Sequence, residues 1–486
     1  MISSVVSRVA GLGALTAAGQ LLIIGSLPAY SRLFEPGTYG EYLIFVGAFA
    51  VVSVLAGLRY DSAIVLPRSE AMAAALFALV MLIALTVATA IAAVTAWAFV
   101  WGLAPVQWQP LERTFGFGLA TATALGALQR CLTGYCIRRG RFLLMGWAQF
   151  LFCLVTVIAQ LLLATVMRQL PALIWGHVCA LGAQTLCLAG PAVRTMSAPW
   201  VAPHSVRAMQ LVARKYRRFP AYMVGYALAS SARDRLIPIV LGLGAGAAAV
   251  GRFGLAYRVA YAPNSLLYSA ISPVFYGIAS RGTALTVGRF SAGLVEATFV
   301  VLIVPYVAFA IEAPLLTDAV LSDKWHGTGP YLQALAGPAL LLAATCWLDR
   351  AFDSFRRQPV AFSLEASFTV AALLAVALLS KFVDPVTVTW AYAALAFIYY
   401  WIYFLLTFVA CRFEIAEFRR ACVTGLGALI IALVLGLLAH QLPELAWRVA
   451  AYALEMAVVV ALWTSLRDGR NILRMLAQSR THAGSR

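Results

Sequence analysis

Long apolar runs recur along the whole chain, and short segments with polar or charged residues separate them. A bilayer core about 30 Å thick is crossed by about 20 residues of helix, which is the length of most of these runs. The runs predict fourteen spans, at residues 9–30, 41–58, 72–101, 114–136, 142–167, 170–191, 220–242, 248–279, 291–311, 331–348, 360–380, 386–410, 421–439 and 445–466. The pattern therefore predicts an all-α integral membrane protein.

Composition supports this assignment. Hydrophobic residues make up 63% of the 486 positions and charged residues 11%, compared with about 25% charged residues in soluble domains. The formal net charge of +17 raises the question of nucleic-acid binding. The basic residues are spread over the short segments between the runs and form no contiguous basic domain. We therefore expect no nucleic-acid partner.

The basic residues are distributed unevenly between the two ends of the predicted spans. With the N-terminus placed in the cytoplasm, 25 of the 36 Lys and Arg residues lie in inside segments, 5 lie outside and 6 lie within spans. Positive residues favour the cytoplasmic side, so an even number of spans and two cytoplasmic termini are predicted. Within the longest inside connection, residues 211–218 form either a basic interfacial helix or a topological anchor.

Sequence signals for a cleaved leader, a zinc site or a nucleotide-binding loop do not alter the prediction of an integral membrane protein. Arg8 precedes the first apolar run without a clear cleavage site, which predicts an uncleaved first span. Cys131 and Cys136 do not have the spacing of a zinc site, and no cysteine lies in a predicted outside loop. The three lysines form no Gly-Lys-Ser/Thr phosphate loop. We expect no metal, no cofactor, no catalytic residues and no disulfides.

A faint internal repeat relates two elements about 210 residues apart. Residues 28–40 begin with a proline, end with a glycine and precede an aromatic residue, and residues 238–251 do the same. The first element joins the first and second predicted spans, and the other joins the seventh and eighth. Two six-span halves followed by a terminal pair would fit this offset, and such repeats are common among transporters.

Three stretches resemble the polysaccharide (O-antigen/exopolysaccharide) flippase branch of the multidrug/oligosaccharidyl-lipid/polysaccharide (MOP) exporter superfamily. They are residues 58–68 (LRYDSAIVLPR), residues 216–220 (YRRFP) with 250–258 (VGRFGLAYR) and 272–276 (SPVFY), and residues 321–331 (LSDKWHGTGPY). The third stretch departs from the family, which usually shows a Phe-Gly-acid pattern where this chain has Leu-Ser-Asp. Together with the number of spans, the resemblance covers nearly the whole chain.

The resemblance implies two six-helix lobes around a central cavity, at residues 1–200 and 201–410, and an accessory helix pair with a cytoplasmic tail at 411–486. It implies a flippase rather than an enzyme, moving an undecaprenyl-diphosphate-linked oligosaccharide across a bacterial inner membrane by alternating access. The product would serve O-antigen, capsule or exopolysaccharide synthesis. Membrane lipids are expected partners, a polysaccharide polymerase is left open as another, and a monomer is expected.

Five arginines are candidates for binding the diphosphate of such a substrate. An anion that crosses hydrocarbon needs fixed cations, and the arginine side chain binds phosphate oxygens in pairs. The candidates are Arg130 in the fourth predicted span, Arg233 and Arg235 in the seventh, and Arg252 and Arg258 in the eighth. Arg233 and Arg235 lie about 200° apart around a helix, so both cannot face one cavity. The alternative for Arg233 and Arg235 is an internal ion-pair network with Asp234, and the alternative for Arg252 and Arg130 is a position near the outer and inner ends of their spans.

Embedded acids are candidates for coupling transport to an ion gradient. A buried carboxylate can take up and release a proton, and Asp234, Glu296 and Glu365 all lie within predicted spans. The alternative is that these groups are hydrogen-bonded at helix interfaces, with Asp234 neutralising a neighbouring arginine.

Other functions remain open at this stage. A small-molecule or cation antiporter of the same superfamily would carry acids in its cavity without a basic cluster. A membrane-embedded saccharide polymerase or ligase would be expected to place catalytic groups in large outside loops, and the longest predicted here is residues 312–330. An assembly scaffold without transport would tolerate replacement of the embedded arginines.

Overall fold

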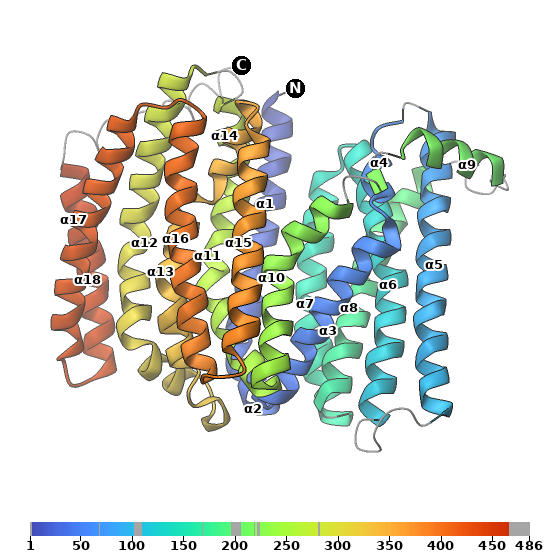
Figure 1. The fold of residues 1–486 in the computed structure, drawn as a ribbon, viewed down its shortest axis with the longest axis horizontal. Helices are drawn as coiled ribbons and strands as arrows, with labels where there is room; N and C mark the ends of the chain where they lie inside the picture. Colours follow the sequence, from blue (N-terminus) through green and yellow to red (C-terminus); the bar gives the residue numbers. More distant parts are fainter. Residues whose placement is uncertain are drawn as a thin grey trace. The chain divides into compact units, whose positions relative to one another are not determined.

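The structure is a computed structural model (Figure 1). It describes residues 2–67, 69–101, 109–167, 169–195, 206–217, 219–220, 224–279 and 282–465. Within these ranges the side chains of residues 2–10, 109–113, 190–195, 226–227, 229–235, 269–270, 273 and 445 are outside the description.

The chain divides into two compact units, which we call the N-terminal unit (Ser7–Gly251) and the C-terminal unit (Arg252–Arg486 with Met1–Val6). The N-terminal unit contains α1 (Ile2–Gly25), α2 (Leu27–Leu33), α3 (Pro36–Gly57), α4 (Tyr60–Ala63), α5 (Glu70–Val100), α6 (Gln109–Arg138), α7 (Phe142–Val166), α8 (Gln169–Thr195), α9 (Val206–Lys215), α10 (Val224–Ala245) and the first residues of α11 (Ala247–Ala279). The lobe boundaries implied by the family resemblance stay predictions.

The C-terminal unit contains the rest of α11 and the remaining helices. These are α12 (Ala284–Val320), the 3₁₀ turn η3 (Asp323–Trp325), α13 (Gly329–Thr345), the 3₁₀ turn η4 (Cys346–Leu348), α14 (Asp349–Ser354), α15 (Gln358–Leu379), α16 (Pro385–Ala410), α17 (Ile415–His440) and α18 (Leu445–Ser465). No strand occurs in the ranges described. The predicted all-α membrane fold is confirmed.

Eleven helices in the described part of the chain are long and apolar enough to cross a membrane. They coincide with eleven of the predicted spans. The other three predicted spans correspond to α6, α10 and α11, which are long helices but are not among the eleven. The count of fourteen membrane spans therefore stays a prediction.

Proline and short polar side chains set several helix starts. Pro36 and Pro385 lie in the first turns of α3 and α16, where the missing N–H costs no hydrogen bond. Asp384 caps α16 by accepting a hydrogen bond from the backbone N–H of Thr387 at 3.0 Å. These residues explain why α3 and α16 begin where they do.

Two glycines bring α3 and the first turns of α11 into contact within the N-terminal unit. A Cβ on Gly40 would lie 1.8 Å from the carbonyl oxygen of Ala247, and a Cβ on Gly251 would lie 1.9 Å from the carbonyl oxygen of Pro36. Gly40 thus packs on the carbonyl four residues before Gly251, and Gly251 packs on the carbonyl four residues before Gly40. Two elements related by a two-fold axis make such mutual contacts. The two elements are those of the sequence repeat, and a larger residue at either crossing point would separate the backbones.

In the C-terminal unit, α17 packs on α12 through a line of small side chains. The buried residues of α17 are Ala421, Gly425, Ala428, Ala432, Gly436 and Ala439. Their spacing of three or four residues places them on one helical face. A Cβ on Gly436 would lie 2.9 Å from the side chain of Val307 in α12. Small residues allow membrane helices to approach closely, so the accessory helix pair is held on α12 by close backbone packing.

Candidate functional site

The candidate arginines lie on the helices that are least apolar. Arg130 is on α6, Arg233 and Arg235 are on α10, and Arg252 and Arg258 are on α11. These are the three long helices that are not among the eleven apolar spans. Ionisable residues in membrane helices face the protein interior or a water-filled path, because hydrocarbon does not solvate them. The polar character of α6, α10 and α11 therefore directs the search for a substrate path to these helices.

In the N-terminal unit, Arg130 forms an ion pair with Asp61. The Nε atom of Arg130 lies 3.5 Å from Oδ2 of Asp61, and its Nη2 atom donates a hydrogen bond to the carbonyl oxygen of Ser53 at 3.0 Å. The Asp61 side chain is 7% exposed and that of Arg130 is 23% exposed. The pair thus joins α6 to α4 and to the last turns of α3 in a largely dehydrated setting.

An unusual turn positions Asp61. Leu58 and Arg59 follow α3 and both have left-handed backbones, with φ angles of 43° and 58°. Residues other than glycine seldom adopt this backbone region, because it costs about 1–3 kcal/mol of conformational free energy for each residue. The turn reverses the chain into the short helix α4, whose carboxylate at Asp61 reaches α6. Tyr60 secures it by donating a hydrogen bond to the carbonyl oxygen of Ala213 in α9 at 3.2 Å.

Arg59 completes a cluster of three charged side chains, which we call the Arg59–Asp61–Arg130 cluster. Arg59 lies close enough to Arg130 to repel it electrostatically. In the described part of the chain, Nε of Arg59 and Oδ1 of Asp61 are buried and have no hydrogen-bond partner. With two guanidinium groups and one carboxylate, the cluster carries an excess positive charge and unused hydrogen-bonding capacity, both of which suit an anion.

Sequence reasoning counted Arg59 only as a topological residue near the membrane surface. Its position two residues before Asp61, within the first stretch that resembles the flippase family, was the available signal. The signal was incomplete because nothing in the sequence indicates that the chain reverses at Leu58 and brings Asp61 to Arg130.

The C-terminal unit contains a second arginine network, formed by Tyr268, Ser272, Asp349, Arg350 and Asp353. Tyr268 donates a hydrogen bond from its hydroxyl to Oδ2 of Asp349 at 2.9 Å and accepts one from Nη2 of Arg350 at 2.5 Å. Arg350 also donates from Nε to the Ser272 hydroxyl at 3.1 Å and from Nη1 to Asp353 at 3.3 Å. We call this the Tyr268–Asp349–Arg350 network. It joins α11 to α14, and sequence reasoning had treated Arg350 as a topological residue.

The two arginines of α11 have different surroundings. Arg252 is half-buried, and its Nε atom has no hydrogen-bond partner among the residues described. It lies near Tyr331 of α13. Arg258 is six residues further along α11 and is also half-buried. The role of Arg252 and Arg258 in substrate binding stays a prediction.

The group that sequence reasoning regarded as most informative lies outside the described side chains. Arg233, Asp234 and Arg235 are on α10, whose backbone is described over Val224–Ala245. Their placement on a long helix agrees with the predicted seventh span. Their roles in substrate binding and ion coupling stay predictions.

Glu296 and Glu365, the other ion-coupling candidates, both have partners. Glu296 of α12 is 2% exposed and accepts a hydrogen bond from Nε of Arg420 in α17 at 3.0 Å. Glu365 of α15 accepts a hydrogen bond from the hydroxyl of Tyr399 in α16. The Tyr399 ring is stacked on Phe368, with 4.2 Å between the ring centroids. Glu296 thus joins the accessory pair to α12, whereas Glu365 joins two neighbouring helices.

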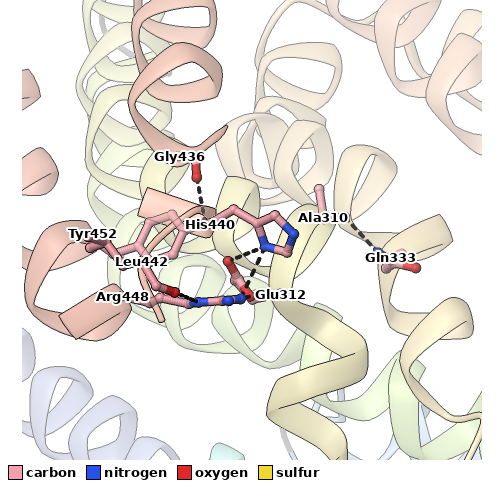
Figure 2. A network of polar contacts seen from close by, with 8 residues as sticks. All are labelled: Ala310, Glu312, Gln333, Gly436, His440, Leu442, Arg448 and Tyr452. Carbon is pink, nitrogen blue, oxygen red and sulfur yellow. Dashed lines mark hydrogen bonds and ion pairs between the residues drawn. The ribbon is translucent and has the colours of Figure 1, made fainter. Parts of the chain in front are cut away.

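Figure 2 shows a further acid that sequence reasoning had placed in an outside loop. Glu312 lies in α12 and is 2% exposed. It accepts a hydrogen bond from Nη1 of Arg448 at 2.8 Å, and its other carboxylate oxygen lies 2.8 Å from Nδ1 of His440. Arg448 also donates to the carbonyl oxygen of Leu442 at 2.8 Å. Because Glu296 and Glu312 contact opposite ends of α17, they fix the accessory pair to α12 at two levels. The α12 helix extends past the predicted end at residue 311 because helix prolines at 305 and 314 do not interrupt it.

No group of three His, Cys, Asp or Glu side chains in the described ranges is arranged to hold a metal ion. The chemistry that the two arginine clusters can perform is binding and neutralisation of charge.

The fold is that of multi-pass membrane flippases and transporters. It is similar to the lipid II flippase MurJ in an inward closed conformation, with a TM-score of 0.74 and 11% identity over 93% of this chain and 98% of that chain. It is also similar to an inward-facing multidrug resistance MATE family transporter of the MOP superfamily, with a TM-score of 0.58 and 12% identity over 84% and 98% of the two chains. A variant of the Vibrio cholerae MATE transporter VcmN gives 0.56 and 17% over 86% and 99%.

Sequence comparison then specifies the family. The model of the polysaccharide biosynthesis protein family matches residues 30–330, which is more than half of the chain. The chain therefore belongs to this polysaccharide biosynthesis family, and the predicted family is confirmed. No curated protein matches the chain in sequence at a significant level.

Proposed function

We propose that this protein is a flippase for an undecaprenyl-diphosphate-linked oligosaccharide repeat unit. It works by alternating access and serves the synthesis of O-antigen, capsule or exopolysaccharide. Two results support the proposal: the polysaccharide biosynthesis family model covers residues 30–330, and the fold is similar to that of a lipid II flippase over 93% of the chain.

The observation that carries the proposal is the concentration of arginine on the three most polar long helices. A lipid-linked diphosphate must move its charge past hydrocarbon, so fixed cations along its path lower the barrier. The Arg59–Asp61–Arg130 cluster supplies such cations at the predicted cytoplasmic end of α3, where the diphosphate would enter. One of Arg233 and Arg235 would continue the path within the membrane, since the two cannot face one cavity. Arg252 and Arg258 are further candidate cations on α11.

The proposal includes a cellular arrangement. The protein lies in the bacterial inner membrane with both termini in the cytoplasm, because that orientation places most basic residues inside. It functions as a monomer of two six-helix lobes with an accessory pair, and it delivers its product to a polysaccharide polymerase outside.

The test is the sidedness of the undecaprenyl-linked saccharide in cells that lack the protein. We expect the saccharide to accumulate on the cytoplasmic face and surface polysaccharide to be lost, both restored by the wild-type gene. Normal translocation with unpolymerised units outside the membrane would contradict the proposal and favour a polymerase or ligase.

Replacing the central arginines tests the cationic path. Arg233→Gln or Arg235→Gln should lower export of the lipid-linked unit, whichever residue faces the path, while the protein stays in the membrane at its normal level. Lysine at the same positions keeps the charge and serves as the matched control. Normal export by both glutamine variants would exclude these two positions from the path.

Ion coupling is tested at the acids. Glu365→Gln should weaken the dependence of transport on a proton or sodium gradient, and Asp234→Asn should do so if it titrates during transport. Glu296→Gln should weaken the same dependence if Glu296 takes part in coupling. Its partner Arg420 belongs to the accessory pair, so this variant also tests whether that pair is involved. A variant with unchanged dependence on pH and sodium has no coupling role at that residue.

The second candidate is a small-molecule or cation antiporter, since MATE transporters share the fold with a TM-score of 0.58. It predicts proton- or sodium-driven efflux of a cationic compound by the purified protein in vesicles, with intact surface polysaccharide in cells that lack it. These results together would replace the flippase proposal.

A further inference from the structure

The short helix α9 has two faces that differ in what they contact. Val212 is 3% exposed and lies in a core cluster with the first turns of α5, including Ala73 and Leu76. The hydrogen bond from Tyr60 and a contact between Nζ of Lys215 and the sulfur of Met72 fix the same face. Figure 1 shows α9 lying across the end of α5, rather than parallel to it. One face of α9 is therefore permanently occupied by the protein itself.

The opposite face carries Arg207, Leu211 and Arg214. At 100° per residue, Arg207 and Arg214 point within about 20° of each other, whereas Val212 points about 140–160° away from them. Arg207 and Arg214 are exposed, and Leu211 is 68% exposed. Neither arginine has an acidic partner in the described part of the chain, and Glu70, the nearby acid at the start of α5, is paired with Arg138 and Arg139.

The position of this face relative to the membrane indicates what covers it. The α5 helix is one of the eleven apolar spans and begins at Glu70, so its first turns mark the edge of the hydrocarbon core. A helix that lies across this end places its outer side chains at the level of the lipid headgroups. Helices at this level insert apolar side chains at the acyl boundary and direct basic side chains to anionic headgroups.

We propose that the Arg207–Leu211–Arg214 face of α9 binds anionic phospholipid headgroups of the inner leaflet. Leu211 inserts at the acyl boundary, and the two guanidinium groups bind headgroup phosphates on either side of it. Because the other face of α9 supports the Leu58–Arg59 turn through Tyr60, bound lipid stabilises the turn that carries Asp61. The inference does not depend on what the protein transports.

The experiment measures thermal unfolding of the full-length purified protein while phosphatidylglycerol is added to detergent, with phosphatidylcholine as the neutral comparison. A ligand that binds only the folded state raises the unfolding temperature. We expect phosphatidylglycerol to raise it in wild type, with a half-maximal effect at about five-fold higher lipid for each arginine replaced, since a basic residue at an anionic surface contributes about 1 kcal/mol. Arg207→Gln/Arg214→Gln should thus shift the midpoint about 25-fold.

Two further variants separate charge from folding. Arg357→Gln/Arg419→Gln removes the same charge from other exposed basic residues and should titrate like wild type. Arg207→Lys/Arg214→Lys keeps the charge and should retain most of the effect, even if the glutamine double variant does not fold. The inference is overturned if the lysine variant loses the effect, or if the glutamine variant folds and titrates like wild type. It is also overturned if undecaprenyl diphosphate in phosphatidylcholine stabilises wild type but phosphatidylglycerol does not.

Discussion

The two units contain arginine networks at comparable places in the chain, but these networks have opposite charge. In the N-terminal unit, Arg130 lies near the end of the fourth predicted span, and in the C-terminal unit, Arg350 follows the tenth. Arg130 contacts Ser53 in the second predicted span and Asp61 just after it. Arg350 contacts Tyr268 and Ser272 in the eighth predicted span.

Their composition differs in a way that affects function. The Arg59–Asp61–Arg130 cluster has two guanidinium groups and one carboxylate, whereas the Tyr268–Asp349–Arg350 network has one guanidinium group and two carboxylates. The carboxylate of Asp61 in the first is buried, whereas the charged side chains of the second are more than one-third exposed. In the described part of the chain, each network leaves one buried carboxylate oxygen without a hydrogen-bond partner, Oδ1 of Asp61 and Oδ1 of Asp349. The first network therefore has an excess of positive charge and the second an excess of negative charge.

The largest expected effect is at Arg130. Arg130→Gln leaves the buried carboxylate of Asp61 without its counter-charge, which destabilises a protein by about 3 kcal/mol at the lower end for buried pairs. Chemical unfolding of the purified protein measures the loss. The double variant Asp61→Asn/Arg130→Gln should recover most of it, and equal destabilisation of the single and double variants would contradict the ion-pair assignment.

A second prediction concerns Arg59, whose Nε has no partner to lose. Arg59→Gln should reduce export of the lipid-linked unit about tenfold, the equivalent of about 1.4 kcal/mol for a lost charge-assisted contact. The free energy of unfolding should stay within about 0.5 kcal/mol of wild type. Normal export would remove Arg59 from the substrate path, and a large stability loss would identify it as a structural residue instead.

Arg350 should matter less to stability than Arg130. Its ion pairs are solvent-exposed to more than one-third, so Arg350→Gln is expected to cost about 1 kcal/mol or less. Tyr268 continues to donate to Asp349 in the variant, which limits the loss. The same unfolding measurement applies, and a loss as large as that of Arg130→Gln would show that exposure does not distinguish the two networks.

The smallest expected effect is the salt dependence of the stability loss caused by Arg350→Gln. Added salt screens exposed charges more strongly than buried ones, with a Debye length of about 3 Å at 1 M. The stability difference between wild type and Arg350→Gln should therefore shrink at 1 M salt, while that of Arg130→Gln should persist. Equal salt sensitivity in both variants would contradict the difference in burial as its cause.

Long elements of the fold were predictable from sequence because apolar length determines a membrane helix. The predicted spans at 142–167 and 386–410 agree with Phe142–Val166 and Pro385–Ala410 within one residue. Short elements were not predictable. A helix of four residues such as α4 buries too little apolar surface to leave a periodic pattern, and the left-handed backbone at Leu58 and Arg59 has no glycine to indicate it.

The candidate site was predictable in residue type but not in assembly. The sequence correctly placed Arg130 on a long helix. The placement of Arg59 and Arg350 on the cytoplasmic side stays a prediction. Charge counting treats every such arginine alike. The distinction between a topological arginine and one in a buried cluster depends on which carboxylate the folded chain brings to it, and that depends on turns of two or three residues.

The reciprocal crossing of Gly40 and Gly251 has an evolutionary consequence. An ancestral half-length chain would have needed only one such glycine, because two copies of that chain related by a two-fold axis would use it twice. In a duplicated and fused chain the two glycines would no longer be the same residue, so each would have to be preserved by separate selection. Loss of either would push apart both backbones at once. Halves of such a chain could therefore diverge in their charges, whereas the point of crossing would keep the constraint of a homodimer.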